Sequence, residues 1–114
     1  MGCDFMDVSS GGLDPSQDIP LGPGYQVHLA EQVRAEADIP SMAVGMINDA
    51  HQAEAIVANG QADMVALARG MLFDPHWAWH AAEELGVEIP YPQQYLRSRP
   101  SLWPQAFTTR TAAE

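Results

Sequence analysis

The sequence predicts an α/β fold with parallel strands, and three observations support this prediction. Short apolar runs at residues 5–10, 41–46 and 63–68 are bounded by Gly, Pro or Asp and are too short for stable helices, so they indicate strands. Segments with helical periodicity follow them, and alternating strands and helices are typical of parallel strands joined by right-handed crossovers. The strands are apolar runs more than alternations, which favours a sheet covered on both faces.

The first two helices have recognisable ends. Residues 25–37 carry an apolar stripe, and Pro40 prevents the helix from continuing. The second helix is expected at residues 50–58, because Asp49 can cap its N-terminus and Asn59–Gly60 is a common left-handed stop.

The third helix is expected from about Asp74–Pro75 to Leu85, since Asp74 can cap it and Pro75 fits the first turn. The loop at residues 11–24 is long for a connection between a strand and a helix, which indicates a functional or lid-like segment. After Glu88 the chain is rich in Pro and is expected to be extended rather than helical.

Composition limits the possible functions. The length of 114 residues suits one domain, and the net charge of −10, with Arg as the only basic residue type, argues against nucleic-acid and anionic-membrane partners. No apolar run approaches the ~20 residues that span a bilayer. A single cysteine, Cys3, excludes an internal disulfide, and no secretory signal is visible, so a cytoplasmic location is expected.

Six segments lie in an order and spacing that identify a family. They are residues 7–11 (DVSSG), 23–27 (PGYQV), 43–47 (AVGMI), 62–69 (ADMVALAR), 74–75 (DP) and 92–97 (PQQYLR). Together they resemble the Old Yellow Enzyme family of NADH:flavin oxidoreductases, and the last segment is similar to the bacterial, thermophilic-like branch.

The resemblance implies a (β/α)8 TIM barrel that holds FMN. It maps this chain onto about three βα units, strands six to eight, as a C-terminal fragment. Residues 1–88 are then a partial barrel at the phosphate end of FMN, and residues 89–114 are a tail at a subunit contact in a homo-oligomer. In the full enzyme, NAD(P)H would pass a hydride to FMN, and FMN would pass it to an activated alkene as the small-molecule substrate. The catalytic residues of the family belong to earlier strands, so the isolated chain is expected to be inactive.

The resemblance assigns four cofactor-binding residues at strand ends. Ser10 would hydrogen-bond the FMN phosphate or ribityl chain, with a turn former that caps the strand as the alternative. Gly45 lets a ligand approach the backbone, or is a plain turn glycine. Arg69 precedes a helical turn and offers a bidentate fork to phosphate, with a surface salt bridge as the alternative. Ala68 stands where the family usually has Gly, and its methyl group would crowd the phosphate if the position needed a positive φ.

The fifth assigned residue is Arg97, which in this branch of the family reaches into the partner subunit beside the flavin; the alternative is a solvated tail residue. His76 and His80 have a spacing that suits a metal, but no third ligand is evident, so no metal site is predicted. The methionines of the strands are expected to fill the core: Met6, Met42 and Met64. Two other functions stay open, a non-catalytic partial barrel that pairs with another chain and a phosphate-binding barrel fragment with a different ligand.

Overall fold

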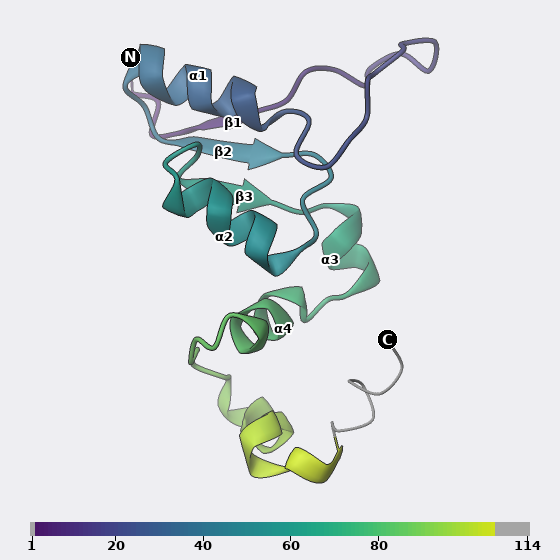
Figure 1. Ribbon diagram of the computed structural model, residues 1–114, viewed down its shortest axis with the longest axis vertical. Coiled ribbons are helices and arrows are strands. Elements are labelled where there is room, and N and C mark those ends of the chain that lie inside the picture. The colour runs from purple at the N-terminus through teal and green to yellow at the C-terminus, as the bar shows by residue number, and fades with distance from the viewer. Residues whose placement is uncertain (1, 107–114) are drawn as a thin grey trace.

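Three short parallel strands form the sheet of the computed structural model, which describes residues 2–106 (Figure 1). The strands are β1 (Met6–Val8), β2 (Ser41–Val44) and β3 (Met64–Ala66), and they lie in the order β1-β2-β3. Helix α1 (Val27–Ala37) connects β1 to β2, and helix α2 (Ala50–Ala58) connects β2 to β3. The predicted parallel α/β fold is therefore confirmed.

One face of the sheet carries the core. Val8, Ala43 and Val65 lie opposite one another in the strand register, so their side chains share this face. They pack with buried residues from both connecting helices: Val27, Ala30, Ala53 and Ile56. Both helices thus cover the same face, as right-handed crossovers in a sheet of sequential strand order require. This arrangement is that of a segment of a (β/α) barrel rather than of a doubly wound sheet.

The other face of the sheet stays outside this core. Asp7, Met42 and Met64 share that face, and Met64 is 36% exposed. The expectation of a sheet covered on both faces is therefore wrong for residues 2–106. Met6 and Met64 are both exposed, so they do not fill the core as predicted.

The predicted ends of α2 are confirmed, but the predicted start of the third helix is wrong. Helix α2 has the expected bounds, Asp49 Oδ1 accepts a hydrogen bond from the Gln52 N–H at 2.8 Å, and Gly60 has a φ of +71°. Helix α4 (Trp77–Glu84) begins two residues after Pro75, and its N-cap residue is His76, with no side chain capping the helix. A further short helix, α3 (Arg69–Phe73), occupies the place where the sequence predicts only a helical turn. Asp74 ends α3 instead of capping α4, and its Oδ1 accepts from the His76 N–H at 3.1 Å in the turn between the two helices.

The described part of the tail, residues 89–106, is not extended as predicted, and residues 107–114 lie outside the described residues. The described part forms three short 3-10 helices: η1 (Gln93–Ser98), η2 (Pro100–Leu102) and η3 (Pro104–Ala106). The φ that proline imposes also suits the first position of a 3-10 turn, so Pro100 and Pro104 begin turns rather than prolong extended chain. Extended geometry is retained at Pro92 and Arg99, which precede the first two turns. None of the helices within residues 2–106 has the length and apolar character to cross a bilayer.

Candidate functional site

The C-terminal ends of the three strands meet at one edge of the sheet. Because the strands are parallel, the residues that follow them emerge on the same side, where α3 also begins (Figure 1). Ser10 follows β1, Gly45 follows β2, and Ala68–Arg69 follows β3. The fold thus brings four of the five predicted site residues to a common edge, which is the edge where parallel α/β proteins bind ligands.

The side chain of Gln26 connects two of these strand ends. It is 4% exposed, and its Oε1 accepts from both the Ser10 N–H at 2.6 Å and the Ser10 hydroxyl at 2.8 Å. Its Nε2 donates to the Val44 carbonyl at 2.8 Å. Sequence reasoning missed this residue, although it lies within the PGYQV segment and its polar side chain precedes an apolar helix. In this arrangement the Ser10 hydroxyl donates its proton to Gln26 Oε1. The hydroxyl would have to give up this hydrogen bond before it could donate to a phosphate oxygen.

The backbone conformation and close neighbours of Gly45 leave no room for a larger residue. Its φ is +116°, and a Cβ there would lie 2.6 Å from Gln26 Nε2 and 2.8 Å from Tyr25 Cε1. The two side chains at the start of the α1 segment therefore approach the Gly45 backbone closely. The glycine serves packing at the edge, and a role toward a ligand would be additional.

Ala68 and Arg69 are compatible with an anion at this edge. Ala68 has a φ of −92°, so its backbone is not in the left-handed region. The methyl group would have crowded the phosphate only if φ were positive, and this is not the case. Arg69 opens α3 and is exposed. Within residues 2–106 its guanidinium makes no hydrogen bond or ion pair, so the surface salt bridge that was the alternative does not form there. A guanidinium without a protein partner is available to a phosphate.

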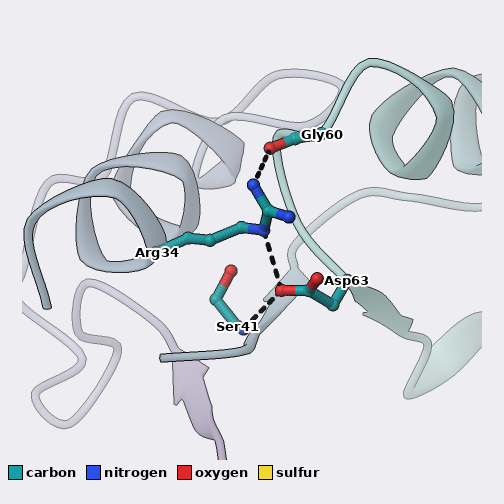
Figure 2. A network of polar contacts seen from close by, with 4 residues as sticks. All are labelled: Arg34, Ser41, Gly60 and Asp63. Carbon is teal, nitrogen blue, oxygen red and sulfur yellow. Dashed lines mark hydrogen bonds and ion pairs between the residues drawn. The ribbon is translucent and has the colours of Figure 1, made fainter. Parts of the chain in front are cut away.

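At the opposite, N-terminal ends of the strands, a polar network connects β2 and β3 (Figure 2). Arg34 Nε donates to Asp63 Oδ2 at 2.9 Å, Arg34 Nη1 donates to the Gly60 carbonyl at 3.1 Å, and the Ser41 N–H donates to the same Asp63 oxygen at 2.9 Å. The Ser41 N–H, followed by the Arg34 guanidinium, holds the pKa of Asp63 below the usual 3.8. Ser41 opens β2 and Asp63 immediately precedes β3, so this network ties the N-terminal ends of two strands and is structural.

Arg97 lies apart from the strand ends. It belongs to η1, is exposed, and makes no hydrogen bond or ion pair within the described part of the chain. Figure 1 shows the tail beyond α4, on the side of that helix away from the sheet. The fold of one chain therefore does not bring Arg97 to the other predicted site residues.

The two histidines have partners on and beside α4. His80 Nδ1 lies 2.6 Å from Asp74 Oδ2, and the His76 ring lies 4.5 Å from the Trp79 ring, measured between centroids. Both contacts hold the start of α4 and explain the histidines without a metal ion.

The fold and the ends of its strands indicate a class: a parallel α/β sheet consistent with part of a (β/α) barrel, with an arginine at the C-terminal strand ends that has no partner within residues 2–106. The sequence profile of the NADH:flavin oxidoreductase / NADH oxidase family matches residues 14–88, which is more than half of the chain. The chain belongs to this family. The predicted resemblance is confirmed, and the family implies FMN as cofactor.

Several similar proteins are NADPH dehydrogenases of bacteria. The one from Geobacillus thermodenitrificans is 51% identical over 96 residues, which are 84% of this chain and 28% of that protein. The one from Bacillus subtilis is 49% identical over 96 residues with the same coverage, and the one from Clostridium acetobutylicum is 42% identical over 95 residues. The chain thus spans 28% of the length of these relatives.

Proposed function

We propose that this chain is the FMN-phosphate end of an NAD(P)H-dependent flavin oxidoreductase that reduces activated alkenes, and that its strands are strands six to eight of the barrel. Family membership supports the chemistry, and the sequential parallel sheet supports the place in a barrel. The observation that carries the proposal is Arg69, an exposed guanidinium at the C-terminal end of β3 that has no partner among the described residues, in a chain of net charge −10.

The residues of the edge fit a phosphate group. Arg69 would bind it as a charged donor, Gln26 holds Ser10 in place, and Gly45 keeps the backbone free of a Cβ. Bound FMN supplies the capacity to accept and pass on a hydride. No residue of this chain is assigned a catalytic role, so the isolated chain would bind cofactor without turning over substrate.

The tail would serve a different purpose. Residues 89–114 are proposed to contact a second copy of the chain, with Arg97 as the contacting side chain. Its exposure and its lack of a partner within residues 2–106 support this role. A cytoplasmic location completes the proposal and is supported by the single cysteine.

The phosphate role of Arg69 can be tested by comparing FMN with riboflavin, which has no phosphate. We expect Arg69→Ala to weaken FMN binding about 10- to 100-fold, as for the loss of a charged hydrogen bond, and to leave riboflavin binding unchanged. Titration with each flavin, followed by flavin fluorescence, measures both affinities. Arg69→Lys keeps the charge at the same position and should retain part of the FMN affinity. Equal losses for the two flavins, or no loss for FMN, would refute the role of Arg69.

A non-catalytic partial barrel that pairs with another chain is the second candidate. The uncovered sheet face with Met42 and Met64 favours it, because such a surface needs a partner. A purified chain that is colourless, well folded and oligomeric, and that binds neither flavin, would support this candidate over the first.

A further inference from the structure

The tail folds back against α4 through a group of aromatic rings. The Trp79 ring of α4 lies 4.6 Å from the Tyr91 ring and 5.3 Å from the Tyr95 ring, the latter edge-on, measured between centroids. The His76 ring, which also contacts Trp79, lies 6.0 Å from the Tyr95 ring. Aromatic pairs at these separations stabilise the contact beyond the area that they bury. Tyr95 therefore fixes the first half of η1 on the helix.

Arg99 fixes the other end of the same turn. Its guanidinium carbon lies 5.0 Å from the centre of the Tyr91 ring, and its Nη2 donates to the Ile89 carbonyl at 3.1 Å. A cation above an aromatic face and a charged donor on a carbonyl are both favourable. Because Ile89 and Tyr91 precede η1 and Arg99 follows it, these contacts close residues 89–99 into a loop.

Arg97 lies between the two anchored residues of this loop. It is exposed and makes no hydrogen bond or ion pair within residues 2–106, whereas Tyr95 contacts Trp79 of α4 and Arg99 contacts the start of the loop. A side chain presented on a fixed turn loses less conformational freedom on binding than one on a free tail.

We propose that Arg99 is a positioning residue: it closes the loop at residues 89–99 and so presents Arg97 to a second copy of the chain. This inference rests on the proposed role of the tail as a subunit contact. Arg99 suits the task better than Lys would, because a planar guanidinium can lie on a ring and still direct an N–H at a carbonyl.

The first test measures the loop itself. We expect Arg99→Ala to raise hydrogen exchange of the η1 amides about tenfold, as for the loss of one charged contact, while exchange in β2 and α2 is unchanged. Arg97→Ala, with the same loss of charge, should leave η1 exchange as it is, and Arg99→Lys should restore part of the protection. Unchanged η1 exchange in Arg99→Ala overturns the proposal.

The second test measures self-association of the full chain by sedimentation, with Met64→Lys present in every variant so that the exposed sheet face does not contribute. Arg97→Ala and Arg99→Ala should each weaken it, and the double variant should be no weaker than Arg97→Ala alone, because Arg99 acts through Arg97. If Arg97→Ala weakens association but Arg99→Ala does not, the positioning role is wrong while the subunit contact stands. If Arg97→Ala has no effect, the subunit contact itself is wrong and the positioning role fails with it.

Discussion

Among single residues, Gln26 connects the strand-end edge most directly, because one buried amide serves both β1 and β2. Leucine at this position would keep the volume but would leave the Ser10 N–H and the Val44 carbonyl without their partner. We expect Gln26→Leu to lower the free energy of unfolding by about 2–3 kcal/mol, the cost of unsatisfied buried polar groups. Urea denaturation measures the change.

Gln32→Leu is the control for this prediction. Gln32 is exposed on α1, and its Nε2 donates only to Glu36 Oε1, at 2.9 Å. Its substitution is expected to change stability by less than about 0.5 kcal/mol. If the two variants lost the same stability, the hydrogen bonds of Gln26 to Ser10 and Val44 would not contribute specifically to stability.

Asp63 makes the stability of the fold depend on pH. Its pKa is lowered in the folded chain, so the carboxylate contributes stability above the ordinary pKa near 3.8, and this contribution is lost as pH falls through the lower folded value. We expect the stability advantage of the natural chain over Asp63→Asn to be present at pH 6 and to be lost progressively as pH falls below the ordinary pKa near 3.8. Thermal unfolding across this range measures the difference.

Asp18→Asn is a suitable comparison, because Asp18 makes no hydrogen bond or ion pair within the described residues. It removes the same charge without touching the network of Figure 2. A pH dependence that is equal in both variants would mean that general charge repulsion, not the pairing of Asp63, sets the acid limit.

At the scale of elements, α4 is attached to the sheet through Trp77. Its indole Nε1 donates to the Asn48 carbonyl at 2.8 Å, and its ring packs against the core cluster. Phenylalanine would keep part of the packing and lose the hydrogen bond. We expect Trp77→Phe to lower the free energy of unfolding by about 1–2 kcal/mol, which chemical denaturation can measure.

Trp103→Phe makes the same chemical change on a side chain that is 63% exposed, and should cost little. If Trp77→Phe were as mild, α4 would be held by its other contacts. His51 and Glu84 provide one of these, an exposed pair at 3.4 Å between α2 and α4, and exposed pairs of this kind stabilise weakly.

At the scale of the whole molecule, one face of the sheet and the edges of β1 and β3 are left uncovered within the described residues. Met42 and Met64 lie on the sheet face that no core residue covers, and β1 and β3 are both edge strands. Apolar faces and open edges promote association. We expect the isolated chain to be marginally stable and to self-associate through this face, and Met64→Lys to reduce that association at least severalfold in light scattering.

Val57→Lys is the matched control, since Val57 is an exposed apolar residue on α2 rather than on the sheet face. It adds the same charge in a different place. A sharply cooperative, strictly monomeric unfolding transition of the unmodified chain would contradict the prediction of an incomplete barrel.

The strand and helix pattern could be predicted because it depends on local information. Apolar runs, Asp49 as a cap and Gly60 as a stop act within a few residues of where they stand, and α2 has its predicted bounds. The same holds for the strand-end positions of Ser10, Gly45 and Arg69, which follow from parallel topology. The conformation of the tail was predicted wrongly because the φ of proline suits both an extended chain and the start of a 3-10 turn. The neighbouring residues alone do not decide between the two.

The sequence by itself determined the family, the parallel α/β order and the residues that gather at the C-terminal edge of the sheet. Only the tertiary structure decided that Gln26 joins two strand ends, that Arg69 lacks a protein partner within residues 2–106, and that Arg99 closes the turn around Arg97. The physical reason is range. Periodicity and capping act between neighbours in sequence, whereas hydrogen bonds between side chains and distant backbone groups exist only after the chain has brought them together.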